Sequence, residues 1–145
     1  MARGKISWEL PYEMPQRPLH ILLVEDHAAT NQTLVRLLSG AGHIVSPAHD
    51  GEAAMKLIQG GRFDVVISDI GLPDTNGWEL LKRLRAHQPD LRAIALTGYG
   101  YPNDMKRSNQ AGFEMHFTKP PDWTSIKSAL ATLFPGPDPA QENKS

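Results

Sequence analysis

The chain of 145 residues contains no cysteine, which excludes disulfides and thiolate metal sites. It also has no excess of either charge, because 15 lysines and arginines face 16 aspartates and glutamates. That balance gives no electrostatic reason to expect a nucleic-acid partner. No apolar run approaches the roughly 20 residues that cross a bilayer, and residues 1–18 lack the apolar stretch of a signal peptide. We therefore expect a soluble, cytoplasmic, single-domain protein that contacts neither nucleic acid nor, through this segment, a membrane.

Two proline-rich ends bracket a periodic middle. Proline lacks a backbone N–H and resists helix formation, so we predict that residues 135–145 form a flexible tail. Residues 1–18 are predicted to be a leader or linker, although residues 5–10 alternate well enough for a short strand. The domain itself is expected to span residues 19–134.

Short apolar runs alternate with amphipathic stretches throughout this middle. Runs that are buried on both faces and separated by helices are typical of a parallel sheet. The pattern predicts a doubly wound α/β domain, with a five-stranded parallel sheet in the flavodoxin-like order 2-1-3-4-5 and five flanking helices. The runs cover residues 20–24, 63–68, 92–96 and 115–118, with a weaker one at 43–45 that we expect Pro47 to end.

Polar side chains mark the ends of the predicted helices. Asp50, Asn76 and Asp122 each stand where an N-cap is needed, before a segment with one apolar stripe. The fourth helix, around residues 103–110, is the exception, because Met105 is its one sizeable apolar side chain. We therefore expect this helix to be the most loosely held.

Polar residues also stand directly after the strands. In an open parallel sheet, ligands bind beyond the carboxyl ends of the strands. Three carboxylates that converge there cannot all stay ionised without compensation, and hard oxygen ligands favour Mg²⁺. A lysine and a hydroxyl at the same edge suit a phosphoryl group on a central carboxylate. Each residue alone also has an ordinary reading, as a helix cap or a surface side chain. The polar residues that follow the strands are Glu25, Asp26, Asp69, Thr97 and Lys119.

Four segments carry a resemblance to a known family. They are ILLVED at 21–26, VVISDIGLPDTNG at 65–77, ALTGYG at 95–100 and FTKP at 117–120. Together, in this order and spacing, they resemble the receiver domain of two-component response regulators. The resemblance implies a phosphoacceptor that switches conformation in a phosphorelay, rather than a turnover enzyme.

The same resemblance implies roles for individual residues. Asp69 is similar to the nucleophile that takes a phosphoryl group from a phosphohistidine. Glu25 and Asp26 are similar to the acidic pair that holds Mg²⁺, Asp26 directly, and the backbone carbonyl of Gly71 completes the ligands. Lys119, with a cis bond to Pro120, is similar to the lysine that contacts the phosphoryl group, and Thr97 to the switch hydroxyl.

Three positions near the site bear on switching and on phosphoryl lifetime. His116 stands where the family often has tyrosine or phenylalanine, and is either a packed structural side chain or a switch residue that titrates with pH. Tyr99 and Gly71 occupy positions that influence hydrolysis of the aspartyl phosphate in the family. Tyr99 offers shielding and Gly71 leaves space, so no net direction follows.

Two features point to the protein context. LTGYG at 96–100, with AGF at 111–113 and His116, resembles receivers of hybrid sensor histidine kinases, and GKISWELP at 4–11 resembles the last strand of a kinase ATP-binding domain. A stand-alone response regulator is the alternative. The implied partners are a histidine kinase or histidine phosphotransfer domain and a downstream protein that reads the face formed by the fourth helix, fifth strand and fifth helix. Phosphorylation-dependent dimerisation stays open.

Other classes fit the residues less well. A Mg²⁺-dependent phosphohydrolase needs a second acid two residues after its nucleophile, where this chain has Gly71. A flavodoxin-like cofactor binder needs a phosphate loop after the first strand, and Glu25 and Asp26 would repel a phosphate there. A degenerate, purely scaffolding receiver is disfavoured by the complete set of acids and lysine.

Overall fold

A computed structural model describes residues 17–98 and 102–136. The predicted strand at residues 5–10 and Tyr99 lie outside these ranges, as do most of the predicted leader and tail. Within the described part, no helix combines the length and apolarity that a membrane span requires.

The described residues form a five-stranded parallel sheet in the order β3-β2-β4-β5-β6. Counted along the chain this is 2-1-3-4-5, so the predicted topology is confirmed. Strand order reverses beside β2, which lies between β3 and β4. The strands are β2 His20–Val24, β3 Ile44–Ala48, β4 Val65–Asp69, β5 Arg92–Thr97 and β6 Met115–Thr118.

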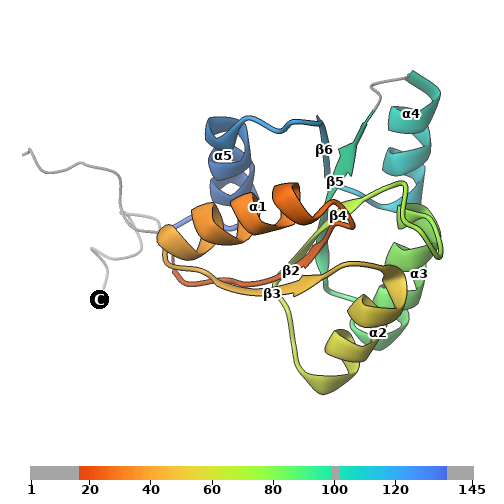
Figure 1. Cartoon of the computed structure of the whole chain (residues 1–145), viewed down its shortest axis with the longest axis horizontal. Helices are drawn as coiled ribbons and strands as arrows, with labels where there is room; N and C mark the ends of the chain where they lie inside the picture. Colours follow the sequence, from red (N-terminus) through yellow and green to blue (C-terminus); the bar gives the residue numbers. More distant parts are fainter. Residues whose placement is uncertain (1–16, 99–101, 137–145) are drawn as a thin grey trace, which may run out of the picture.

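Helices cover both faces of the sheet (Figure 1). α1 and α5 lie over one face, whereas α2 and α3 lie over the other with α4 beside them. The helices of the described chain are α1 Ala28–Gly40, α2 Gly51–Gly60, α3 Gly77–His87, α4 Pro102–Ala111 and α5 Trp123–Leu133.

The central strands supply two hydrophobic cores. Leu22 and Val24 pack with residues of α2 and α3, while Ile21 and Leu23 pack with residues of α1 and α5. Successive side chains of a strand point to opposite faces, so a strand that is apolar throughout is buried on both. This burial, about 2 kcal/mol for a fully buried leucine, fixes the strand ends on which the polar residues stand.

Two of the three predicted caps are confirmed. The carboxylate of Asp50 accepts a hydrogen bond from the backbone N–H of Ala53 at 2.8 Å, and Asn76 Oδ1 accepts one from Glu79 at 2.9 Å. Asp122 does precede α5, but its side chain makes no capping bond to the helix backbone. It lies 3.3 Å from the Ser125 hydroxyl instead.

Pro47 does not end the second strand, contrary to the prediction. β3 runs through it to Ala48, and Pro47 is the register partner of Leu23. β3 is an edge strand, where a residue without an N–H can face away from its neighbour. The sheet therefore tolerates a proline that a central strand would exclude.

The anchoring of α4 also differs from the prediction. Met105 is 43% exposed and does not hold the helix. Ser108 is buried instead, and its hydroxyl accepts a hydrogen bond from Trp78 Nε1 at 2.9 Å. The guanidinium of Arg107 lies 4.0 Å from the centre of the Trp78 ring. α4 thus makes two polar contacts with one tryptophan of α3, while Ala111 at its end packs against the core.

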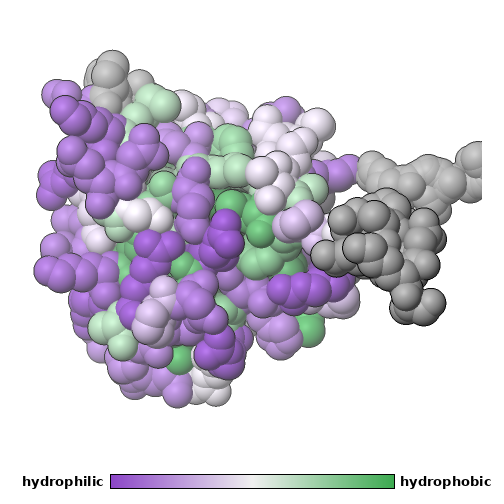
Figure 2. All heavy atoms as spheres, turned by 180° about the vertical axis from the view of Figure 1, so that it is seen from behind, coloured by the Kyte–Doolittle hydropathy of each residue, from purple (hydrophilic) through white to green (hydrophobic). Residues whose placement is uncertain are grey.

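At the edge of the sheet opposite β3, apolar side chains lie near the surface. Seen from behind, hydrophobic residues are exposed near the middle of the molecule (Figure 2). Met115 and Phe117 of β6 and Ala129 of α5 line a shallow groove of about 320 Å³.

Candidate functional site

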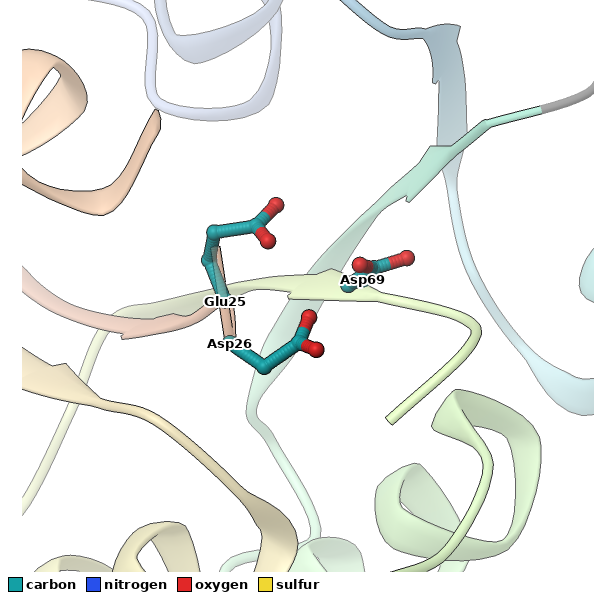
Figure 3. Close-up of side chains that lie close together, drawn as sticks. All are labelled: Glu25, Asp26 and Asp69. Atoms are coloured by element: carbon teal, nitrogen blue, oxygen red, sulfur yellow. The ribbon is translucent and has the colours of Figure 1, made fainter. Parts of the chain in front are cut away.

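Three carboxylates meet at the carboxyl edge of the sheet. Glu25 and Asp26 directly follow β2, and Asp69 ends the adjacent strand β4. One oxygen from each side chain lies within 4.8 Å of the others, and Figure 3 shows them converging on one space. The neighbouring positions of β2 and β4 thus produce the acidic cluster that the sequence predicts.

Glu25 and Asp26 differ in their surroundings. Glu25 is fully buried, and its two carboxylate oxygens accept hydrogen bonds from Lys119 Nζ at 2.7 Å and from the backbone N–H of His27 at 2.8 Å. Asp26 is exposed at the rim. Asp26 therefore offers its carboxylate to an incoming cation more openly than Glu25 does.

Lys119 links two of these acids from the loop after β6. Its ammonium lies 2.7 Å from Asp69 Oδ2 as well as 2.7 Å from Glu25 Oε1. Burial alone would lower the pKa of Lys119, but the hydrogen bonds to Asp69 and Glu25 outweigh burial and raise it. The Lys119–Pro120 peptide bond is cis, as expected from the resemblance.

The charges of this cluster do not balance. Three carboxylates carry −3, and within the described chain the one cation paired with them is Lys119, which leaves −2. The donors are all carboxylate oxygens, the ligands that Mg²⁺ and Ca²⁺ prefer. The residues present therefore fit a hard divalent cation.

Asp69 is held in a fixed orientation. It is 5% exposed, and its Oδ1 accepts a hydrogen bond from the backbone N–H of Gly71 at 3.1 Å while Oδ2 contacts Lys119. Gly77 packs directly behind it: a Cβ there would lie 2.7 Å from the backbone carbonyl oxygen of Asp69. Gly77 was not identified from the sequence, because it reads there as an ordinary residue after the Asn76 cap.

A cavity of about 320 Å³ opens beside Asp69. It brings together the predicted residues Thr97, Gly71 and Lys119, and Thr97 is buried at the end of β5. Asp104, in the first turn of α4, also lines this cavity and was missed. In the sequence Asp104 is simply an acid near a helix start, and the path of the chain after β5 is what carries it to the site.

A larger hollow lies elsewhere on the described surface. It measures about 710 Å³ and is lined by residues at the amino ends of the strands, including His20, Asp64 and Arg92. None of the acidic cluster contributes to it. This hollow lies at the opposite end of the strands from the three carboxylates, so it is not part of the acidic site.

The loop after Asp69 is tied to α2. The carboxylate of Asp74 accepts hydrogen bonds from the backbone N–H groups of Gly51 at 2.9 Å and Glu52 at 3.0 Å. The bond from Gly51 is the main cause that lowers the pKa of Asp74. Asp74 thus caps a helix distant in sequence, a role that residue spacing alone does not reveal.

His116 lies on β6, near α4. Its ring nitrogens are buried without a hydrogen-bond partner among the described residues. Burial lowers the pKa of His116, and the charge of Asp104 partly opposes that shift. The imidazole is therefore held preferentially neutral, whichever of its two predicted roles it has.

Comparison with known proteins agrees with this geometry. A sequence model of the response regulator receiver domain matches residues 21–131. The chain belongs to the response regulator receiver family. The matched segment contains every residue of the acidic cluster, together with Thr97, His116 and Lys119.

Relatives of this receiver domain differ in overall size. The transcriptional regulatory protein CusR of Escherichia coli K12 is 30% identical over 116 residues, which are 80% of this chain and 51% of CusR. The sensor protein EvgS of the same strain is 29% identical over 133 residues, 92% of this chain and 11% of EvgS. The chain therefore spans about half of one relative and a small part of the other.

A solved structure shares the whole fold. The response regulator TrrA of Thermotoga maritima, in complex with Mg²⁺ and BeF, aligns with a TM-score of 0.71 at 28% identity. The alignment covers 79% of this chain and 98% of TrrA. The receiver domain described here is thus similar to almost the whole chain of that TrrA structure.

Proposed function

We propose that this receiver domain accepts a phosphoryl group on Asp69 from a phosphohistidine of a histidine kinase or histidine phosphotransfer domain. The observation that carries the proposal is the setting of the Asp69 carboxylate. It is fixed between Lys119 and the Gly71 N–H at the mouth of a cavity large enough for a phosphoryl group. Membership of the receiver family supports the same reaction class.

Mg²⁺ is the cation that we propose for the acidic cluster. Asp26, Asp69 and the backbone carbonyl of Gly71 would bind it, with Glu25 adding its charge from the buried side. When bound, Mg²⁺ would neutralise charge on the phosphoryl oxygens and restrict their orientation. The excess of −2 in the cluster supports this assignment, and the complex of TrrA with Mg²⁺ is consistent with it.

The chain's own residues would then act in sequence. An oxygen of Asp69 forms a bond to phosphorus as the P–N bond of the donor breaks, and the electron pair of that bond returns to the imidazole nitrogen. Lys119 donates to a phosphoryl oxygen, which compensates the charge that Asp69 has gained. The Thr97 hydroxyl moves toward another phosphoryl oxygen, and α4 follows because it begins a few residues beyond Thr97.

Incubation with acetyl phosphate and Mg²⁺, followed by intact mass measurement, tests this function. We expect a mass gain of one phosphoryl group that disappears in Asp69→Asn and when Mg²⁺ is chelated. Asp90→Asn makes the same change in charge near the opposite end of the sheet and should leave the gain intact. No gain with several small donors and a phosphorylated kinase would overturn the proposal.

We further infer that the receiver belongs to a hybrid sensor kinase system. The segments at 96–100 and 111–113 support this, and the alignment with the sensor protein EvgS extends over 92% of the chain. A stand-alone regulator is the alternative. Transfer from a purified phosphorylated kinase core tests the assignment: preference for a hybrid kinase core over the kinase of a stand-alone regulator is expected, and equal rates would contradict it.

The output surface that we propose is the face formed by α4, β6 and α5. The groove lined by Met115, Phe117 and Ala129 supports it, because apolar side chains at a sheet edge are candidates for burial by a partner. Light scattering with and without Mg²⁺ and beryllofluoride separates two uses of this face. Dimers that form with beryllofluoride and vanish in Phe117→Asp would assign it to self-association, and monomers in both conditions to another protein.

A further inference from the structure

Another hollow lies between α3 and α4, apart from the acidic site. It has a volume of about 590 Å³ and shares no residue with the cavity beside Asp69. Its apolar lining is Trp78 with the small side chains Ala86 and Ala111. Its polar lining is Glu79, Lys82, Arg85, Arg107 and Gln110.

The cations of this hollow are not equally available. Arg85 is committed, because its guanidinium donates to the backbone oxygens of Leu91 and Gly112 and pairs with Glu114 at 3.3 Å. Lys82 and Arg107 are exposed and have no ion pair among the residues that the structure describes. With Glu79 counted against Lys82 and Arg107, the available charged side chains that line the hollow carry a net charge of +1.

Arg107 is oriented before any ligand arrives. Its guanidinium lies over the Trp78 ring at 4.0 Å, within the range of a cation–π contact. Trp78 is itself fixed, since its indole N–H donates to the buried Ser108 hydroxyl at 2.9 Å. A stacked guanidinium keeps its edge N–H groups available for bidentate binding of a carboxylate, and little conformational entropy remains to be lost.

We propose that this α3–α4 groove is a docking site for an acidic peptide segment of a partner protein. One carboxylate of the segment binds Arg107, a second binds Lys82, and an apolar side chain between them covers Ala111 beside the stacked Arg107–Trp78 pair. Charge complementarity selects the acidic partner. A nucleic acid fits poorly, because two available cations on a short groove form no extended basic stripe and the chain has a net charge of −1.

Nuclear magnetic resonance of the full 145-residue chain tests the proposal. The probe is a short blocked peptide of alternating leucine and glutamate pairs, with a glutamine-for-glutamate peptide as its control. We expect the acidic peptide to shift the Trp78 indole signal and the amides of residues 78–86 and 107–111, and to leave the Trp123 indole signal in place. The glutamine peptide should shift none of them.

A double variant tests which charges bind the peptide, and a variant elsewhere on the surface is its control. Arg107→Glu combined with Lys82→Glu should weaken binding by about tenfold or more, as loss of a central arginine does at other interfaces. The same variant should bind a lysine-for-glutamate peptide. Arg36→Glu, on an exposed arginine of α1 that likewise has no ion pair in the described chain, is the control and should bind as the unmodified protein does.

Several results would overturn the proposal. They are no shift at the Trp78 indole with millimolar peptide, equal binding of the glutamine peptide, or an equal loss in Arg36→Glu. Stronger shifts of the same signals with a short DNA duplex or with anionic lipid vesicles would assign the groove to a different class of partner. If the double variant unfolds, Arg107→Lys replaces it, and an unchanged affinity there contradicts the stacked, bidentate arginine.

Discussion

Lys119 determines the charge balance of the site at the scale of single residues. Its ammonium contacts Glu25, which is fully buried, and Asp69, which is 5% exposed. An ion pair in such a place is not in itself strongly stabilising, but removal of one partner leaves a buried charge without compensation. The raised pKa of Lys119 keeps the ammonium protonated at neutral pH.

Lys119→Ala should therefore lower the free energy of unfolding by about 3 kcal/mol at neutral pH. In a Glu25→Gln background the same substitution should cost less, because one of the two carboxylates is already neutral. Urea denaturation of the four proteins in this double-mutant cycle measures the difference. Lys127→Ala, on the exposed side of α5, is the control and should change stability little. Strictly additive losses would contradict the coupling.

His43 is a second buried polar residue, and it is far from the acids. It is 8% exposed, and its Nδ1 accepts a hydrogen bond from the backbone N–H of Leu19 at 3.1 Å. Burial lowers the pKa of His43 below the ordinary value of 6.5. The folded state thus favours the neutral ring, which alone can accept that bond.

Stability should consequently fall as the pH drops. Above about 6.5 the ring is neutral in both states and contributes nothing to the pH dependence. Below that value the unfolded chain binds the proton first, so stability is lost until the pH passes the lowered folded-state pKa. His43→Asn keeps an acceptor at the same position and should flatten this part of the profile, as followed by thermal unfolding between pH 7 and pH 5. An equally steep profile in His43→Asn, or a flattened one in the exposed control His87→Asn, would refute the assignment.

At the scale of elements, α4 is the helix with the weakest apolar attachment. Met105 is exposed, and α4 contacts α3 through the hydrogen bond from Trp78 to Ser108 and through Ala111, which packs against the core that α3 covers. A single neutral hydrogen bond contributes about 1 kcal/mol net. An element held in this way is suited to shift its position when residues near its start move.

Ser108→Ala removes the acceptor and leaves the Trp78 N–H without its partner. We expect a loss of about 1 kcal/mol in the free energy of unfolding and faster amide hydrogen exchange confined to residues 103–111. Ser128→Ala, on the exposed side of α5, serves as the matched control. Exchange that accelerates throughout the sheet, or that does not change in α4, would show that Ser108 is not what attaches this helix.

The same helix shows where sequence reasoning reaches its limit. Strands are recognisable because a continuous apolar run needs no knowledge of its neighbours, and the caps at Asp50 and Asn76 are local for the same reason. The Trp78–Ser108 bond joins residues 30 positions apart, so nothing in the local pattern of either residue reveals it. Pro47 is a similar case, since its tolerance depends on the position of β3 at the sheet edge.

The residues of the site fall into the same two groups, those that the local sequence pattern reveals and those that it does not. Glu25, Asp26, Asp69, Thr97 and Lys119 stand at strand ends, which the fold class alone brings to one edge. Asp104, Asp74 and Gly77 reach the site or its loop through the paths of connecting segments, and these were not anticipated. The sequence alone therefore identifies the candidate site residues at the strand ends, but not those on the connecting segments.

At the scale of the whole molecule, the parallel sheet joins stability to ligand binding. Glu25 and Lys119 are 94 positions apart, yet they meet because β2 and β6 both direct their carboxyl ends to this edge. The fold thereby concentrates an excess negative charge of −2 at one place. A cation that binds the folded chain and not the unfolded one must then stabilise the molecule by mass action.

Mg²⁺ should therefore raise the free energy of unfolding, by about 2.7 kcal/mol at a concentration one hundred times its Kd. Asp26→Asn should abolish this response, because the exposed carboxylate that first meets the cation is gone, while the metal-free variant should be at least as stable as the unmodified protein since it carries less repulsion. Asp90→Asn, with the same change in charge near the other end of the sheet, should keep the full response. Thermal unfolding against MgCl₂, with NaCl at equal ionic strength to account for screening, measures all three proteins. An identical Mg²⁺ response in Asp26→Asn, or one reproduced by NaCl, would place the stabilising cation away from the acidic cluster.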